Sequence, residues 1–227
     1  MNKPRIVIKL SGSLFNFDTN SSLLNEYVQL IKKISKVYQP VVITGGGKIA
    51  RFYINLSRSL GLDESGLDLI GIQVSHLNAR LLISGLGEYC YPLPPKNLEE
   101  ISVALLSGLV IVTGGLYPGQ STNATSALIA ERTGATRFYN ATDVDGIYDS
   151  DPRTNPEANK FEKISVQDCV NILKSEKSMA GTYDLMDLIS LKVIERSNLP
   201  TVVFKSTVEN IEKLVLDNVN MGTEITI

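Results

Sequence analysis

Five short runs of apolar and β-branched residues alternate along this chain with longer segments of helical periodicity. Each run is short and shows little alternation between apolar and polar residues, as in strands that are buried on both faces. The expected strands are residues 5–10, 40–44, 108–113, 135–141 and 200–205. Strands that alternate with helices predict an α/β protein, a three-layer αβα sandwich around a mainly parallel sheet.

Helices are expected in the longer segments that separate these strands or follow them. Their predicted ranges are 21–37, 48–60, 67–86, 97–106, 121–133, 165–175 and 187–197. The segment 145–164 is rich in Asp, Pro and Asn, and we expect it to leave the sheet. The sequence contains no internal repeat or linker composition, so residues 1–227 are expected to form a single domain.

Composition limits the partners of the chain. A formal net charge of −2 argues against a positive surface that binds nucleic acid or an anionic membrane. An anionic ligand would therefore have to be held by groups at its own binding site. Two cysteines, Cys90 and Cys169, and a single histidine, His76, argue against a zinc site or a disulfide framework. Residues 101–130 carry no charge, but glycine and proline interrupt them, and the N-terminal apolar run is too short for a signal peptide. We expect a cytoplasmic protein without a membrane partner.

Three of the expected strands end in Ser or Thr followed by glycine. They read "IKLSGS" (8–13), "VITGGGK" (42–48) and "IVTGGLYPGQSTN" (111–123). Glycine lets backbone N–H groups face an anion, and a helix start adds its free N–H groups and its positive dipole end. Because the carboxyl ends of parallel strands lie at one edge of a sheet, the three loops predict a cradle for several phosphates. Neither GxxxxGK[ST] nor GxGxxG is present, which argues against a P-loop or Rossmann protein.

Five segments in this order and spacing make the sequence resemble a known family. They are "IKLSGS", "TGGGKIAR", "DLIGIQVSHLNARLL" (68–82), "TGGLYPGQSTNATSALIAE" (113–131) and "TDVDGIYDSDPRTNP" (142–156). The chain resembles the amino-acid kinase family, and within it the UMP kinases of the archaeal type, from Lys3 almost to the C-terminus. The resemblance implies the amino-acid kinase fold, transfer of a phosphoryl group from ATP to UMP with Mg²⁺, a role in pyrimidine nucleotide synthesis, and a homohexamer.

The resemblance also assigns nucleotide sites. The residues expected to bind ATP are Lys9, Ser11, Gly12, Gly47, Arg51, Thr142, Asp143, Tyr148 and Asp151. The residues expected to bind UMP are Gly46, Asp68, Tyr117, Pro118, Gly119, Gln120, Ser121, Thr122 and Asn123. The family has an aspartate in some relatives where this chain has Asn123, which is a departure.

Lys9, Asp143 and Asp145 are the candidate catalytic residues. A fixed ammonium at Lys9 would stabilise charge on the transferred group, whereas the alternative is a solvated lysine at a strand end. One of the carboxylates could orient Lys9 or reach Mg²⁺ through water. Asp143 departs from the Asn or Lys of many UMP kinases, and Asp145 has the alternative of a turn aspartate before Gly146.

Two residues of the segment 68–82 have competing interpretations. Asp68 is either the N-cap of the following helix or an acceptor for the ribose hydroxyls of UMP, and both roles are compatible. The apolar face of that helix is expected at Ile72, Leu77 and Leu81. His76 is expected to be a packed or surface histidine rather than a general base, because the phosphate of UMP is already ionised near pH 7.

Two other functions remain open from the sequence. One is another small-molecule kinase of the family, of the isopentenyl phosphate or acetylglutamate type. The isopentenyl phosphate enzymes carry a histidine soon after the GGG loop, and this chain has none between residues 45 and 75. The other is a non-catalytic nucleotide-binding member, against which the presence of Lys9 and both nucleotide loops argues.

Overall fold

The computed structural model describes residues 3–150, 152, 155–174 and 186–227, and in these residues one sheet contains seven strands. The strand order is β3-β2-β1-β4-β6-β7-β5. The strands are β1 (Arg5–Leu10), β2 (Gln39–Thr44), β3 (Ile111–Thr113), β4 (Phe138–Thr142), β5 (Lys163–Ser165), β6 (Thr201–Lys205) and β7 (Gly222–Thr226). Neighbouring strands run parallel except β6 and β7, so the sheet is mainly parallel, as predicted.

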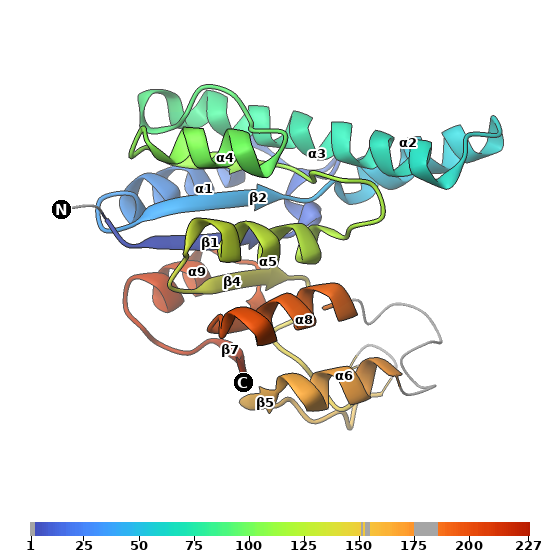
Figure 1. The fold of residues 1–227 in the computed structure, drawn as a ribbon, viewed down its shortest axis with the longest axis vertical. Helices are drawn as coiled ribbons and strands as arrows, with labels where there is room; N and C mark the ends of the chain where they lie inside the picture. The colour runs from blue at the N-terminus through green and yellow to red at the C-terminus, as the bar shows by residue number, and fades with distance from the viewer. Residues whose placement is uncertain (1–2, 151, 153–154, 175–185) are drawn as a thin grey trace.

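Helices cover both faces of this sheet. The α-helices are α1 (Ser21–Ile34), α2 (Gly47–Ser59), α3 (Glu64–Leu86), α4 (Leu98–Leu105), α5 (Thr122–Thr133), α6 (Val166–Lys174), α8 (Leu188–Ser197) and α9 (Val208–Val215). Side chains of α1, α3 and α9 share one apolar cluster, and those of α4, α5, α6 and α8 share the other. In Figure 1, α5 and α8 lie in front of the strands and α1 and α9 behind them. The three-layer αβα sandwich is therefore confirmed.

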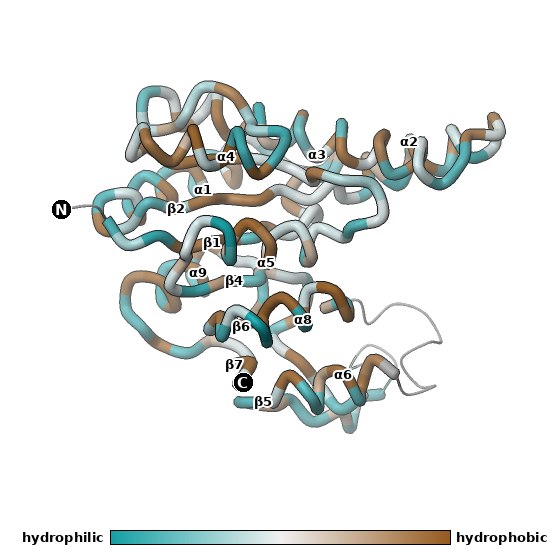
Figure 2. The backbone as a smooth tube through the Cα atoms, viewed as in Figure 1, coloured by the Kyte–Doolittle hydropathy of each residue, from teal (hydrophilic) through white to brown (hydrophobic). Residues whose placement is uncertain are grey.

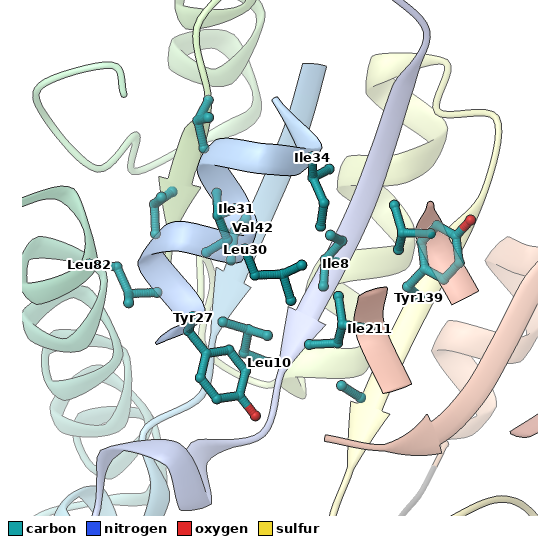
Figure 3. Close-up of a cluster of buried hydrophobic side chains, with 14 of the residues drawn as sticks. Ile8, Leu10, Tyr27, Leu30, Ile31, Ile34, Val42, Leu82, Tyr139 and Ile211 are labelled. Atoms are coloured by element: carbon teal, nitrogen blue, oxygen red, sulfur yellow. The ribbon is translucent and has the colours of Figure 1, made fainter. Parts of the chain in front are cut away.

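Alternate residues of β1 supply both cores. Ile8 and Leu10 face the cluster under α1, where Figure 3 shows Ile8 beside Ile34 and Ile211, while Val7 belongs to the opposite cluster. All three β1 side chains are almost fully buried, and burying one such side chain is worth about 1.5–3 kcal/mol. Figure 2 shows hydrophobic colour along β2, which lies between β1 and β3 in the sheet. These strands are apolar on both faces because helices cover both sides of the sheet.

The order of the strands creates a topological switch at β1. The chain proceeds from β1 outward through β2 to β3 and then crosses back to β4, which pairs with the other side of β1. Ligands of open α/β sheets bind at the carboxyl ends of the strands at such a point. In Figure 1, β2 and β4 point to the same end of the sheet, beyond which α2 and the start of α3 extend.

The structure corrects the expectations for the helix that carries Asp68. It begins at Glu64, three residues before the predicted start, and Asp63 is its N-cap, accepting from Gly66 N at 2.7 Å. Asp68 lies inside the helix, so its interpretation as an N-cap is wrong. Leu77 and Leu81 are exposed rather than packed in the core, because the buried face of α3 is formed by other residues. These are Leu67, Val74, Ala79, Leu82 and Leu86.

Two strands and one α-helix among the described elements were not predicted, namely β5, β7 and α9. The segment 145–164 does leave the sheet, with Tyr148 and Lys160 in an antiparallel bridge, but it returns to the sheet at Lys163. β7 runs antiparallel to β6, where a Cβ on Gly222 would lie 2.6 Å from Phe204 Cβ. No helix among the described residues is both long and apolar enough to cross a membrane.

Candidate active site

One cavity of about 550 Å³ opens at the carboxyl edge of the sheet, at the switch between β1 and β4. We call it the active-site cavity. It is lined by the ends of β1 and β4, the loop between β2 and α2, and the first residues of α5. The lining residues are Lys9, Ser11, Gly12, Ser13, Asn16, Gly45, Gly46, Gly47, Lys48, Arg51, Ser121, Thr122, Asn123, Thr142, Asp143 and Val144. Most of the residues expected from the sequence are thus brought together.

The glycines of the first two loops pack against each other. A Cβ on Gly12 would collide with the backbone of Gly47, lying 2.7 Å from its Cα, and a Cβ on Gly47 would collide with the carbonyl of Gly12. Gly47 also has φ +62°, a conformation that favours glycine. Asn78 Nδ2 donates to Gly45 O at 2.8 Å, and Asn16 Oδ1 accepts from Lys48 N at 3.2 Å. These glycines therefore allow two loops to meet, in addition to leaving backbone exposed to a ligand.

Lys9 lies near the end of β1, partly buried beside the end of β4. Its Nζ lies 3.4 Å from Ala141 O. Burial lowers the pKa of Lys9 to about 8, and the opposing effect of the Asp143 charge raises it only in part. The amine is therefore mostly an ammonium at pH 7. Its one hydrogen bond among the described residues, to Ala141 O, is long, so the ammonium can also contact an anionic ligand.

Asp143 follows β4 and is held by the loop that follows β1. Its Oδ1 accepts from Ser11 Oγ at 2.5 Å and from Ser13 Oγ at 2.8 Å. Partial burial alone would raise the pKa of Asp143, but the two hydroxyl donors and the charges of Lys9 and Arg51 outweigh it, so the pKa is lowered. Ser13 was missed from the sequence, although the pattern Ser-Gly-Ser places its hydroxyl next to that of Ser11.

Arg51 and Lys48 bring further positive charge to the same cavity. Both lie in the first turns of α2, which begins at Gly47, and both side chains are exposed. The free N–H groups and the dipole of a helix start favour an anion at this position. Together with Lys9, the cavity can hold a group of several negative charges.

The start of α5 forms another wall of the cavity. Ser121 at this start was expected from the sequence, whereas its partner Asp187 was not. Ser121 is the N-cap, accepting from Ala124 N at 3.0 Å and donating its proton to Asp187 Oδ2. Asp187 is itself the N-cap of α8, in a capping box with Ser190. Sequence reasoning missed Asp187, because the pattern of a helix cap does not reveal a partner 66 residues away. The Ser121 hydroxyl proton is committed to Asp187, which leaves Thr122 and the backbone of α5 to face a ligand.

The loop before α5, residues 114–121, is held by α3, and we call it the acceptor loop. Asp68 Oδ2 accepts from Gly119 N at 2.7 Å. Ser75 Oγ accepts from Gly115 N at 2.9 Å, and His76 Nε2 lies 2.8 Å from Gly115 O. His76 is therefore a packed residue that positions this loop, as expected from its isolation in the sequence.

The predicted UMP residues divide into two groups. Gly46, Ser121, Thr122 and Asn123 line the active-site cavity. The described lining residues do not include Asp68 or residues 117–120, which lie beside it on the loop and on α3. Gln120 Oε1 is buried and has no hydrogen-bond partner among the described residues.

The second candidate carboxylate, Asp145, is engaged elsewhere. Its Oδ1 accepts from the Tyr148 hydroxyl at 2.6 Å, and its Oδ2 lies 3.4 Å from Lys160 Nζ. Burial acts to raise its pKa, but the Tyr148 hydrogen bond and Lys160 lower it, and the same bond raises the pKa of Tyr148 to about 12. Among the described residues, those lining the active-site cavity do not include Asp145 or Tyr148. Asp151 lies outside the described residues.

Carboxylates are scarce in the cavity. Asp143 is the one carboxylate among the described residues that line it, and its Oδ2 has no hydrogen-bond partner among them. The described residues contain no group of three or more His, Cys, Asp or Glu side chains that could hold a metal ion. Mg²⁺ usually keeps several waters and binds through one or two carboxylates and the phosphates of a nucleotide, which the position of Asp143 fits.

Comparison with known proteins agrees with this geometry. The family model described as the amino acid kinase family matches residues 4–205. A uridylate kinase of Hyperthermus butylicus is 40% identical over the whole of both chains, and one of Methanoculleus marisnigri is 39% identical over 97% of this chain and 95% of that protein. The crystal structure of a uridylate kinase from Archaeoglobus fulgidus has a TM-score of 0.88 at 38% identity, covering 97% of this chain and 99% of that one. The chain belongs to the amino acid kinase family.

Proposed function

We propose that this protein is a UMP kinase, which transfers the γ-phosphoryl group of ATP to UMP and releases ADP and UDP. The observation that carries the proposal is the meeting of Lys9, Asp143 and the start of α5 in one cavity at the switch of the sheet. Relatives about 40% identical over nearly the full chain, all named uridylate kinase, support the choice of acceptor.

In the proposed reaction, an oxygen of the UMP phosphate attacks the γ-phosphorus of ATP, and the bond to the ADP oxygen breaks. Negative charge is spread over the moving group, so a preorganised ammonium at Lys9 stabilises the transition state. Asp143, fixed by Ser11 and Ser13, carries a negative charge that raises the pKa of Lys9 and so favours its ammonium form. The attacking phosphate is already ionised near pH 7, so no protein base is needed.

The phosphates of ATP are proposed to lie between Lys9 and the start of α2, where Arg51 and the backbone at Gly12 and Gly47 line the cavity. Mg²⁺ bound with ATP would neutralise charge on the β- and γ-phosphates. Asp143 is the carboxylate that would reach that ion, directly or through water.

UMP is proposed to lie against the acceptor loop, with its phosphate at the start of α5. Backbone N–H groups and the helix dipole favour a dianion there without a cation in contact. Uracil presents one N–H donor between two carbonyl acceptors, and the buried amide of Gln120 has an unpartnered Oε1 among the described residues to receive that donor. Asp68, whose Oδ2 accepts from Gly119 N, is proposed to accept from the ribose hydroxyls as well.

An ADP-release assay over a panel of acceptors tests the proposal. The panel is UMP, CMP, GMP, AMP, isopentenyl phosphate, glutamate and acetylglutamate. We expect the highest kcat/KM with UMP. Preference for isopentenyl phosphate or an amino acid would identify another kinase of the family, and ATP binding without turnover on any acceptor would identify a non-catalytic member.

Assembly into a cytoplasmic homohexamer is part of the proposal. Large apolar side chains are exposed on the outer surfaces of α2 and α3, which no other described element covers. They are Phe52, Tyr53, Leu56, Leu69, Leu77 and Leu81. Several large exposed apolar side chains on two helices that pack together favour contact with another protein surface. Light scattering is expected to give a mass near six times the 24.8 kDa of one chain, and a monomeric mass would contradict the assembly.

A further inference from the structure

Asn78 is a buried polar residue of α3 that contacts the glycine loop between β2 and α2. Its side chain is 5% exposed, and its Nδ2 donates to Gly45 O at 2.8 Å, across 33 residues of sequence. Among the described residues, Asn78 is the one hydrogen-bond donor to this carbonyl. A buried amide needs such a partner, and here the partner is a backbone group of the active-site cavity.

Gly45 lies between Asn78 and the loop that follows β1. A Cβ on Gly45 would lie 3.2 Å from Gly12 N, so the residue is enclosed on that side as well. Gly45 is buried, whereas the next residue, Gly46, is half-exposed and lines the cavity. The N–H group of Gly46 has no acceptor among the described residues. The peptide between the two glycines therefore joins a carbonyl that α3 holds to an N–H group that can donate to a ligand.

This peptide links the two groups rigidly. Peptide bonds among the described residues are trans and planar, so the C=O of Gly45 and the N–H of Gly46 point in opposite directions. Asn78 holds the carbonyl toward α3, which packs in the apolar cluster on one face of the sheet. The N–H is therefore directed toward the other face, where α5 packs and where its first residues line the cavity.

The glycines alone do not fix this direction. Neither residue has a Cβ, so the peptide between them can rotate to the reversed orientation with little steric hindrance. In the reversed orientation a carbonyl oxygen, rather than an N–H donor, would face an anion in the cavity. A donor that stabilises a transition state has to be oriented before the reaction begins. The hydrogen bond from Asn78 provides this orientation.

We infer that Asn78 is a positioning residue for phosphoryl transfer, which orients the Gly45–Gly46 peptide so that Gly46 N–H donates to the group in transit between the two nucleotides. The inference rests on the proposed function, because it needs a phosphoryl group in the active-site cavity. Asn78 is not among the described residues that line this cavity, so it acts through the peptide. It lies on the buried face of α3, so an assembly that covers Leu77 and Leu81 on the exposed face leaves its contact unchanged.

Asn78→Leu removes the donor and nearly keeps the volume of the side chain. We expect kcat with UMP to fall roughly 10²-fold, as after removal of one preorganised donor, while KM for ATP and for UMP changes less than about threefold. This division between kcat and KM distinguishes an oriented donor from a general loss of packing, which would impair the binding of both nucleotides.

Gln39→Leu is the matched control. Gln39 is 6% exposed, and its Nε2 donates to Leu105 O at 2.9 Å. This is a buried amide–carbonyl bond of the same kind, at the opposite end of β2 from the glycine loop. Both variants should lower the midpoint of thermal unfolding by several degrees, because each leaves a buried carbonyl without its donor. Gln39→Leu should nevertheless keep the kcat of the wild type.

A measurement on the wild-type chain does not depend on any substitution. Gly46, Gly47 and Gly115 are the residues that follow another glycine in the sequence, so protein labelled with glycine that carries ¹⁵N and a ¹³C carbonyl gives three signals in an HNCO spectrum. The probe is aluminium fluoride with ADP, UMP and Mg²⁺, which imitates the phosphoryl group in transit. We expect aluminium fluoride to move the Gly46 amide proton downfield of its position with ADP and UMP alone. Gly115, whose N–H donates to Ser75, should stay nearly in place.

The same probe is applied to Asn78→Leu. The downfield shift of Gly46 should be lost, and the aluminium fluoride complex should bind roughly 10²-fold more weakly, in parallel with kcat, because such a complex resembles the transition state. The affinity for ADP alone should equal that of the wild type.

Two results would overturn the inference. One is a Gly46 signal in the wild type that does not respond to aluminium fluoride, and the other is a folded Asn78→Leu protein whose kcat falls no more than that of Gln39→Leu. Failure of the proposed function looks different, because it appears in the wild type as a preference for another acceptor of the panel. The same measurements with that acceptor then decide the role of Asn78, and a wild type without turnover on any acceptor refutes both proposals.

Discussion

Gly12 and Gly47 lie with their backbones in contact, so that neither position has room for a Cβ. The loop after β1 and the loop after β2 meet through this contact, and both glycines line the cavity that contains Lys9. The two glycines therefore fix the distance between the lysine and the start of α2. The sequence alone indicates a tight turn or an anion-binding loop at each of these glycines.

Gly12→Ala is expected to separate these loops. The change should lower kcat/KM roughly 10²-fold, the effect of misplacing a reacting group by about 1 Å. Gly71→Ala is the matched control, because a Cβ there meets only Ile54 Cδ1 at 3.4 Å and alanine suits a helix interior better. Steady-state kinetics and thermal unfolding of both variants check this, and unimpaired kinetics in folded Gly12→Ala would show that the loops tolerate separation.

The activity is expected to decline as the pH rises through about 8, because Lys9 then loses its charge. The decline should appear in kcat/KM, which reports the free enzyme, and move to higher pH in kcat, since bound phosphates favour the ammonium. Lys9→Met should lower kcat roughly 10²–10³-fold and abolish this limb of the profile. Turnover at the wild-type level in a folded Lys9→Met protein would remove Lys9 from the mechanism.

The same group affects stability in the opposite direction. The pKa of Lys9 is about 8 in the folded protein against an ordinary value of 10.5, so the unfolded chain binds more protons between these pH values. The contribution of Lys9 to the free energy of unfolding therefore rises with pH across this window. Urea denaturation at pH 7 and pH 10 gives the change in the free energy of unfolding between these pH values for wild type and for Lys9→Met. The same change in both proteins would contradict a lowered pKa of Lys9.

Asp143→Asn is expected to move the basic limb of the pH profile to lower pH. The Asp143 charge raises the pKa of Lys9, and an amide at this position can still accept from Ser11 and Ser13 but carries no charge. Ser13→Ala is the control, because it removes one hydrogen bond and keeps the carboxylate. Profiles of kcat/KM that coincide for wild type and Asp143→Asn would show that Asp143 does not act on Lys9.

Sequence reasoning predicted the central part of the fold because its strands are apolar on both faces. β1 was predicted at the residues where it occurs, and α5 within one residue of its start. β5 and β7 were missed because β5 has only three residues and β7 contains a glycine, a glutamate and two threonines, so the apolar signal of each is weak. The pairing of β7 with β6 also depends on a chain reversal that no periodicity indicates.

The candidate site divides in the same way. Residues in the glycine loops could be predicted, since loops at the ends of parallel strands share one edge of the sheet. Contacts between distant segments could not, and these include Ser121 with Asp187 and Asp68 with Gly119. Asp145 shows the converse, because proximity in sequence to Asp143 suggested a shared role, whereas the chain turns away and pairs it with Tyr148.

Arg51→Ala is expected to weaken ATP binding about tenfold and UMP binding less, because its guanidinium lies at the start of α2. Arg58→Ala is the control on the same helix, where the side chain pairs with Glu64 outside the cavity. Calorimetric titration of both variants with each nucleotide gives the comparison. An ATP affinity equal to that of wild type would place Arg51 among the solvated surface residues.

Asp68 has two candidate roles, one in holding the acceptor loop and one in binding the ribose of UMP. Its Oδ2 holds the acceptor loop at Gly119 N, and the remaining oxygen is the one proposed to accept from the ribose hydroxyls of UMP. A site that pairs with a hydroxyl discriminates against an analogue that lacks it, so UMP is expected to exceed dUMP in kcat/KM. Asp63→Asn is the control, because Asp63 is the true N-cap of α3 and asparagine also serves as a cap.

Asp68→Asn is expected to reduce the preference for UMP over dUMP. The amide oxygen can still accept from Gly119, but the charge-assisted bond to the ribose, worth roughly 1–3 kcal/mol, is lost. The two roles give different kinetics. A carboxylate that only anchors the loop would raise KM for UMP and dUMP by the same factor on substitution, leaving their ratio unchanged. A ribose contact makes the loss larger for UMP, so the ratio of the two kcat/KM values falls in Asp68→Asn and stays at the wild-type value in Asp63→Asn.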